Sequence, residues 1–329
     1  ICEKFSIVWM LFFVIGNKMS AQNPVSQSNI MLTYGLLVFI WATTPLAIVW
    51  SVQDLHLMWA LVIRFFLALP IALALLWLLK IHFPFDKVAL HSYVAGSFSL
   101  MGSQFFTYLA TNYLSSGIIA LMFGLSPIMA GLIGRFGFQQ KLHRLQWFGM
   151  SVSVCGLAVI CMSSGAGQHV HPIGIALMLM SVFTYCLSIF WVKKVNATVE
   201  PMAQATGSIL VSTGVAIALL PFIWQYAPTH IPETKSLLAL FYTVIMASLL
   251  AMFCYFKLVQ NIKATTLSLT TVMTPMLAML FGAVLNNEKP SQMVFVGAGI
   301  LLSGLFLYFY KDFKANRILA EKLKQVDRS

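Results

Sequence analysis

The chain has 329 residues, of which 60% are hydrophobic and only 9% are charged. Soluble domains carry roughly 25% charged residues, so this composition excludes a soluble fold and predicts an all-α integral membrane protein. The formal net charge of +11 does not indicate a nucleic-acid partner, because the basic residues do not cluster on a soluble domain.

Residues 1–29 precede the first long apolar run. They begin without a methionine, and their apolar stretch, Phe5 to Ile15, is too short to span a bilayer comfortably. We expect translation to start at Met19, which makes residues 1–18 an upstream extension followed by a polar lead. A signal peptide is the alternative, although the stretch holds few basic residues and no clear cleavage site.

Ten hydrophobic runs of about 20 residues follow, which is the length that a helix needs to cross the hydrocarbon core. Short polar turns that contain proline or glycine separate several of them. The predicted transmembrane helices are 30–50, 57–79, 92–111, 114–134, 146–163, 172–192, 203–224, 236–256, 264–285 and 292–310. The charged tail, residues 311–329, is predicted to form an amphipathic helix on the cytoplasmic surface.

The second half of the chain repeats the first at a spacing of 148 residues, without gaps. The identical pairs are Pro127/Pro275, Ala130/Ala278, Leu132/Leu280, Gly134/Gly282, Lys141/Lys289, Gly149/Gly297 and Gly156/Gly304. Most of these residues are proline or glycine, which have backbone reasons for their positions. Five spans per half is an odd number, so the second half must cross the membrane in the opposite orientation. The sequence therefore predicts two inverted five-helix repeats, residues 30–163 and 172–310.

Lysine and arginine residues are distributed unevenly between the two sides of the predicted bundle. If the amino terminus is cytoplasmic, the outer loops hold only Lys235 and Lys289, and every other basic residue except Arg64 falls in an inner segment or the tail. Cytoplasmic loops are enriched in basic residues. Both termini are therefore predicted to be cytoplasmic.

All nine acidic residues and all seven histidines fall in loops, at span edges or in the tail. Proton-coupled pumps, cation exporters and intramembrane enzymes need such groups inside the bilayer. The five cysteines form no CxxC motif and no pairing with histidine. We therefore predict no metal site, no cofactor and no enzymatic activity.

Arg64 is the exception among the charged residues. It lies about eight residues into the second run, where an arginine must face protein or water. One interpretation is a docking charge for a carboxylate or phosphate of the cargo, because a guanidinium offers a bidentate fork. The other is structural, with the arginine bonded to backbone carbonyls at helix ends or extended to the outer interface.

The third run is the least apolar of the ten. Gln104 and Tyr108 are four residues apart and share a helix face, which suits a cavity wall. Hydrogen bonding between packed helices is the alternative. Trp41, Thr44 and Tyr185 are further candidates for an aromatic and polar lining, so we expect all five residues to line a substrate cavity.

Ser126-Pro127 and Thr274-Pro275 occupy matching positions in the two repeats. A proline leaves the carbonyl four residues earlier, here Phe123 or Thr271, without its helical partner, and the neighbouring hydroxyl can satisfy it. We expect helix kinks at Pro127 and Pro275 and cavity-lining roles for Ser126, Thr271 and Thr274, because inverted-repeat carriers bind cargo near the midplane. Simple packing kinks are the alternative.

Trp41-Ala42, Arg64-Phe65 and the repeat cores SSGIIALMFGLSPIMAGLIG and KATTLSLTTVMTPMLAMLFG resemble the EamA-type transporters of the drug/metabolite transporter superfamily. The resemblance implies movement of small metabolites, often export of amino acids or related compounds, across the inner membrane of bacteria. The family has a glutamate after the proline-containing helix of each half. Glu288 matches it in the second half, but Gln140 replaces it in the first.

The favoured prediction is a ten-helix carrier that works by alternating access around a cavity between its halves. A passive channel or a non-transporting membrane scaffold is the alternative, and an intramembrane enzyme is disfavoured by the lack of titratable groups in the spans. The expected partners are a small-molecule metabolite and the lipid bilayer. We expect a monomer or a homodimer.

Overall fold

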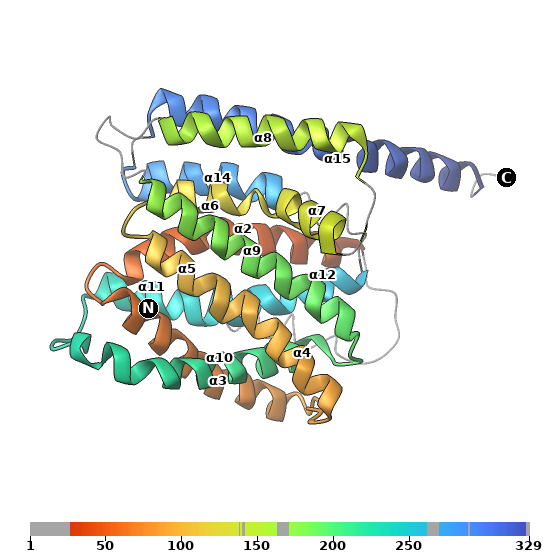
Figure 1. The fold of residues 1–329 in the computed structure, drawn as a ribbon. Helices are drawn as coiled ribbons and strands as arrows, with labels where there is room; N and C mark the ends of the chain where they lie inside the picture. The colour runs from red at the N-terminus through yellow and green to blue at the C-terminus, as the bar shows by residue number, and fades with distance from the viewer. Residues whose placement is uncertain are drawn as a thin grey trace.

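The computed structural model describes residues 27–137, 139, 142–162, 171–261, 270–288 and 290–326. Within these ranges the regular structure is helical and no strand occurs, as the composition predicts. Figure 1 shows the helices side by side, with their axes in one general direction and the carboxyl-terminal end of α15 extending beyond the others. The predictions for residues 1–26, Gln140 and Lys289 lie outside the described residues.

The helices fall into two sets, one before residue 163 and one after residue 170. The first set is α2 (Gln27–Ser51), α3 (Leu57–Leu78), α4 (Lys87–Ser97), η1 (Phe98–Gly102), α5 (Ser103–Ala110), α6 (Ser116–Phe123), α7 (Ser126–Gly137) and α8 (Arg144–Met162). The second set is α9 (Pro172–Val195), α10 (Pro201–Ile223), η2 (Trp224–Tyr226), α11 (Thr234–Tyr242), η3 (Thr243–Leu250), α12 (Ala251–Asn261), α14 (Thr270–Leu285) and α15 (Gln292–Val326). The segments η1 and η3 are π-helical and continue the α-helices on either side.

Seven helical stretches of the described chain are long and apolar enough to cross a membrane. They are Asn29–Ser51, Leu57–Leu78, Ser116–Gly137, Pro172–Val195, Pro201–Tyr226, Thr234–Tyr255 and Gln292–Tyr310. The apolar parts of α8 (Arg144–Ile160) and α14 (Met273–Leu285) are shorter, at 10–17 residues. The count of ten spans therefore stays a prediction.

The outer surface of the bundle carries large apolar side chains. Trp77 is 80% exposed, Phe136 77% and Phe222 76%. Exposure of such side chains is unfavourable in water but favourable in contact with lipid chains. The surface therefore suits a bilayer.

The fourth predicted span differs from its counterpart at the matching prolines. α6 ends at Phe123 and α7 begins at Ser126, whose hydroxyl donates to the Phe123 carbonyl as predicted. By contrast, α14 continues through Pro275, and no described residue bonds the buried Thr274 hydroxyl. The first proline thus accompanies a break in the helix, and the second lies inside a continuous helix.

The charged tail does not form a separate helix within the described residues. α15 is one helix of 35 residues, from Gln292 to Val326, so the tail continues the last apolar segment. Strong helix formers such as Ala, Leu, Lys and Glu dominate this part, and nothing in the sequence breaks the helix after Tyr310.

Glycines allow α8 and α15 to pack closely. A Cβ added at Gly149 would lie 2.6 Å from the Gly304 carbonyl oxygen, and a Cβ added at Gly297 would lie 2.8 Å from that of Gly156. Only glycine permits such an approach of two backbones. Residue numbers rise along one helix as they fall along the other, so the two helices are antiparallel.

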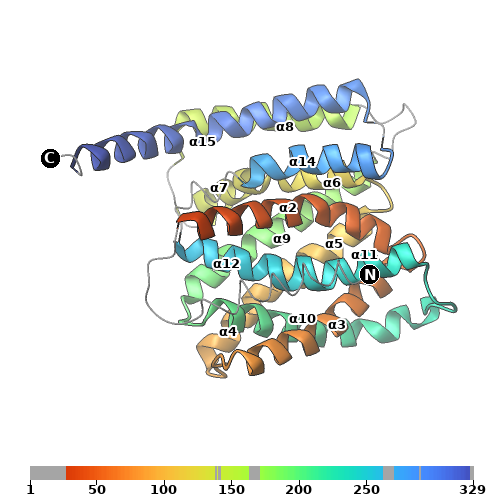
Figure 2. The ribbon, with the colours of Figure 1, turned by 180° about the vertical axis from the view of Figure 1, so that it is seen from behind.

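Helices from the two sets pair with one another across the bundle. α8 packs against α15, α6 against α14 and α3 against α10. Figure 1 shows α5 and α9 on the near side, and Figure 2, turned by 180°, shows α2, α11 and α12 on the near side. The middle of the bundle is thus enclosed by helices from both sets.

Candidate functional site

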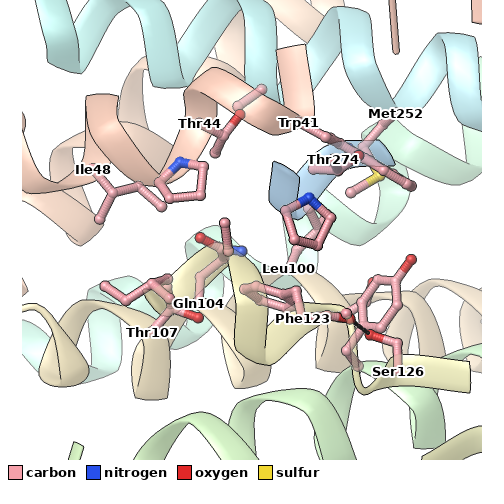
Figure 3. A pocket seen from close by; sticks show the side chains of 18 of the residues that line it. Trp41, Thr44, Ile48, Leu100, Gln104, Thr107, Phe123, Ser126, Met252 and Thr274 are labelled. Atoms are coloured by element: carbon pink, nitrogen blue, oxygen red, sulfur yellow. Dashed lines mark hydrogen bonds between the residues drawn. The ribbon is translucent and has the colours of Figure 1, made fainter. Parts of the chain in front are cut away.

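A cavity of about 120 Å³ lies in the middle of the bundle. A cavity needs roughly 10–15 Å³ to hold one water molecule, so this one is large enough for a ligand of several non-hydrogen atoms. Figure 3 shows the α2 side chains Trp41, Thr44 and Ile48 along one side, and Gln104, Thr107, Phe123 and Ser126 along the other. Both sets of helices contribute to its wall.

Most of the residues that the sequence nominates for a substrate cavity line this one. These are Trp41, Thr44, Arg64, Gln104, Ser126, Tyr185 and Thr274, together with the kink residue Pro275. They come from α2, α3, α5, α7, α9 and α14, which are far apart in the chain.

Three residues that the sequence nominates are not among the described lining residues of this cavity. Tyr108 is fully buried, packs in the core around α3 and α10, and its hydroxyl has no partner among the described residues. Pro127 follows Ser126 in α7 but does not line the cavity. Thr271 belongs to α14, and its side chain lies outside the described residues.

Sequence reasoning missed a larger set of lining residues, most of them apolar. They are Pro45, Ile48, Ser99, Leu100, Thr107, Ile119, Ala120, Phe123, Gly124, Ala247 and Met252. Apolar residues in apolar helices carry no signal of a cavity, because lipid and packed helices select the same side chains. Thr107 was detectable as a polar residue three positions after Gln104, on nearly the same helix face.

Arg64 is 2% exposed and lies in the wall of the cavity. Its Nε donates to the Ser248 hydroxyl at 2.8 Å, and its Nη1 donates to the Gln104 side-chain oxygen at 3.1 Å. Both bonds go to side chains rather than to the backbone carbonyls of the structural interpretation. Arg64 of α3 therefore links α5 of the first set to η3 of the second.

The two π-helical segments flank the cavity. Ser99 and Leu100 of η1 and Ala247 of η3 line it. Ser248 donates to the Thr243 carbonyl five residues earlier at 2.9 Å. π-helical turns within α-helices occur frequently at functional sites, which agrees with their place here.

A second cavity, of about 90 Å³, adjoins the first. Trp41, Ser99, Leu100, Tyr185 and Met252 line both of them. The second cavity also reaches Lys193, in the last turn of α9. Together the two cavities extend from the middle of the bundle toward the carboxyl end of α9.

At the opposite end of the bundle, hydrogen bonds connect four residues that we call the Glu288 cluster, namely Ser116, Gly117, Asn286 and Glu288. The Glu288 carboxylate accepts from the Ser116 amide at 3.1 Å, the Ser116 hydroxyl at 2.5 Å and the Gly117 amide at 3.2 Å. The Asn286 side chain donates to the same carboxylate at 3.1 Å. These bonds cap the start of α6, where free N–H groups favour an anion.

Further hydrogen bonds join helices at the same end. The Trp50 indole donates to the Asn286 side-chain oxygen at 2.7 Å, which connects α2 to the Glu288 cluster. The Ser236 hydroxyl bonds both the Trp50 carbonyl, at 3.1 Å, and the Asp54 carboxylate, at 2.9 Å. Polar contacts between helices are therefore dense at this end.

The described residues contain no group of three or more His, Cys, Asp or Glu side chains that could hold a metal ion. The lining of the first cavity likewise includes no acidic residue, histidine or cysteine. Its chemistry is confined to one cation, hydroxyl and amide groups, and aromatic rings. These groups can hold a ligand through hydrogen bonds, ring contacts and one positive charge.

The model of the EamA-like transporter family matches this sequence twice, at residues 28–162 and 172–310. The chain belongs to this family. The two matched segments correspond to the two sets of helices that enclose the cavity, and membership makes the protein a membrane transporter.

Curated relatives are similar along most of their length. The uncharacterized inner membrane transporter YedA of Escherichia coli K12 is 24% identical over 272 residues, which cover 82% of this chain and 87% of YedA. A probable amino-acid metabolite efflux pump of the same strain is 22% identical over 259 residues, which cover 72% of this chain and 85% of the pump. Protein PagO of Salmonella typhimurium is 23% identical over 288 residues, which cover 84% of this chain and 92% of PagO.

A solved crystal structure also superposes on the protein. Its TM-score is 0.60 at 17% sequence identity, and the superposition covers 89% of this chain and 99% of the other. At that identity the likeness shows the shared fold alone.

Proposed function

We propose that the protein is a carrier that exports small metabolites, amino acids or related compounds, by alternating access. One observation carries the proposal: both family-matched segments line one cavity in the middle of the bundle, with the hydrogen-bonded Glu288 cluster at one end of the bundle and a second cavity that reaches toward the other end. Two halves that open a shared cavity to one side at a time need this arrangement. The amino-acid metabolite efflux pump among the relatives supports the cargo class and the direction.

The halves are proposed to be inverted repeats related by a twofold axis. Hydrogen bonds between counterparts, meaning residues at equivalent positions of the two repeats, support this. Ser153 donates to the Leu301 carbonyl at 3.0 Å, and Thr213 donates to the Phe65 carbonyl at 3.3 Å. Each pair is separated by 148 residues, the spacing of the sequence repeat. A residue that touches its own counterpart lies next to the axis.

The lining of the cavity supports the same axis. Three pairs of counterparts at this spacing line it: Ser99 and Ala247, Gln104 and Met252, and Ser126 and Thr274. The π-helical segment η1 also coincides, after the shift, with the last five residues of η3. A cargo site on this axis contacts equivalent residues of both halves, as alternating access requires.

The orientation follows from the distribution of positive charge, with both termini in the cytoplasm and the protein in the inner membrane as a multi-pass chain. The description of YedA as an inner membrane transporter supports the inner membrane as the location of this protein. In that orientation the Glu288 cluster lies at the outer end, and the second cavity leads to the cytoplasm. The described conformation then corresponds to an inward-facing state, and a monomer or homodimer is still expected.

Counterflow in proteoliposomes tests the proposal against a passive channel and a non-transporting scaffold. Vesicles preloaded with a mixture of unlabelled amino acids and their keto and hydroxy acid relatives should accumulate the labelled compounds transiently and saturably. Thr44→Trp fills the cavity and should abolish the signal, whereas Thr33→Trp, on α2 outside the cavity lining, should not. Non-saturable flux would indicate a channel, and no flux by folded protein would refute the carrier.

A further inference from the structure

Arg64 is a buried cation for which the described residues supply no anionic partner. It is 2% exposed, and its two hydrogen bonds go to the neutral side chains of Ser248 and Gln104. A guanidinium has five N–H donors, so three of them have no acceptor among the described residues. A buried charge is costly unless an opposite charge pairs with it. Among the described residues, the Arg64 guanidinium therefore has neither an opposite charge nor acceptors for all of its donors.

The carboxylates of the chain do not fill this role. The acidic residues with described side chains all lie between helices or at helix starts, namely Asp54, Asp86, Glu200, Glu233 and Glu288. None of them lines the cavity. The Asp86 carboxylate caps α4, and that of Glu288 caps α6. An anion beside Arg64 is therefore most simply supplied by a ligand.

The rest of the cavity wall is largely apolar and aromatic. Trp41, Phe123, Tyr185 and Met252 line it, and the rings of Phe123 and Tyr185 meet edge to face with centroids 6.2 Å apart. Such surfaces bind apolar or aromatic groups. No described carboxylate is present there to pair with an ammonium group, so a cargo cation would be left without a partner.

We propose that the cargo is an organic monocarboxylate with an apolar or aromatic body and no ammonium group, and that Arg64 binds its carboxylate. This inference rests on the proposed carrier function and narrows its cargo class. Ser248 and Gln104 hold the guanidinium by Nε and Nη1, which leaves a pre-oriented fork for a bidentate carboxylate. Thr274 also lines the cavity, and its buried hydroxyl has no hydrogen-bond partner among the described residues.

Equilibrium binding to the purified full-length protein at pH 7.5 tests the inference. Radiolabelled phenylacetate and 4-methylpentanoate serve as probes, and phenylacetamide, phenylalanine and phenethylamine serve as uncharged, zwitterionic and cationic competitors. At least one acid should bind saturably, and the three competitors should be about 10- to 100-fold weaker, the range expected for losing a bond to a charged group. Saturable binding of neither acid, or equal competition by phenylacetamide or phenylalanine, would overturn the inference.

Variants locate the binding on Arg64. Arg64→Gln should weaken acid binding about 100-fold, and Arg64→Lys, which keeps the charge but not the fork, about 10-fold. Arg135→Gln removes the same charge from an exposed position of α7 and should change nothing. Unchanged acid binding by a folded Arg64→Gln protein would overturn the assignment. If neither Arg64 variant folds, the competition series on the unaltered protein decides.

Counterflow of the same compounds separates this inference from the function on which it rests. Saturable counterflow of phenylalanine or phenylacetamide without any preference for the acids would keep the carrier and reject the carboxylate site. Absence of saturable counterflow for every compound, including the amino-acid mixture, would reject the carrier itself.

Discussion

Substitution of Glu288 tests whether the Glu288 cluster keeps one end of the bundle closed. The Glu288 carboxylate accepts three hydrogen bonds from the first residues of α6, at 3.1, 2.5 and 3.2 Å. A hydrogen bond to a charged group contributes about 1.5–3 kcal/mol when buried. Because Glu288 is only half-buried, we take about 1 kcal/mol for each bond, or about 3 kcal/mol for the closed end.

These energies predict the size of the shift between conformations. About 1.4 kcal/mol is a tenfold change in an equilibrium constant. Glu288→Ala, which removes all three bonds, should therefore favour opening at this end about 100-fold. Glu288→Gln keeps one side-chain oxygen as an acceptor and should favour opening about tenfold.

Labelling of a cysteine in the cavity measures this opening. Ile48→Cys is suitable, in a background without the native cysteines, because Ile48 lines the cavity and is 2% exposed. A membrane-impermeant maleimide added outside intact cells should react about 10- and 100-fold faster in the glutamine and alanine variants, respectively. Glu233→Gln removes an exposed charge without a side-chain capping bond and is the control. Equal rates in folded Glu288→Ala and unaltered protein would refute the reasoning.

Three further predictions concern packing, pH and topology. Gly149→Ala should lower the melting temperature measurably, because its Cβ would lie 2.6 Å from backbone atoms of Gly304 and Tyr308. Gly299→Ala, with nothing within 4 Å, should not lower it. Burial lowers the pKa of His56, which stacks on Tyr226 at 4.4 Å. The unfolded chain therefore binds more protons below about pH 6.5, and thermal stability should fall as the pH drops from 7 to 5. His56→Phe should reduce that loss, and an unchanged pH profile would contradict the assignment. For topology, an impermeant maleimide should label His171→Cys from outside intact cells and Gln139→Cys only after permeabilisation. The reverse pattern would reject the proposed orientation.

The positions of the helices could be predicted from the sequence. The apolar runs at 57–79 and 172–192 match α3 (Leu57–Leu78) and α9 (Pro172–Val195) to within a few residues. A bilayer offers no water to unpaired backbone groups, so a long apolar run is expected to form a helix, which satisfies these groups within the segment. The family was predictable from a resemblance that is also a property of the chain itself, carried by Trp41-Ala42, Arg64-Phe65 and the two repeat cores.

The π-helical segments were not predictable in the same way. Neither η1 nor η3 contains proline, and their residues are as apolar as those of the α-helices around them. A π-turn widens a helix only where neighbouring contacts offset its poorer geometry. The bond from Arg64 to Ser248 within η3 is a contact of that kind, and it joins residues that are 184 positions apart.

By itself, the sequence determined that the chain is helical, repeated and suited to a membrane, because these properties depend on local backbone chemistry. Only the tertiary structure decided which faces of the helices meet at the cavity. Leu100, Gln104 and Thr107 face it, whereas Tyr108 packs in the core. Lipid and neighbouring helices select similar apolar side chains, so periodicity says little about how a helix is rotated. The partner of Glu288, 172 residues earlier in the chain, likewise becomes a neighbour only when the two halves pack together.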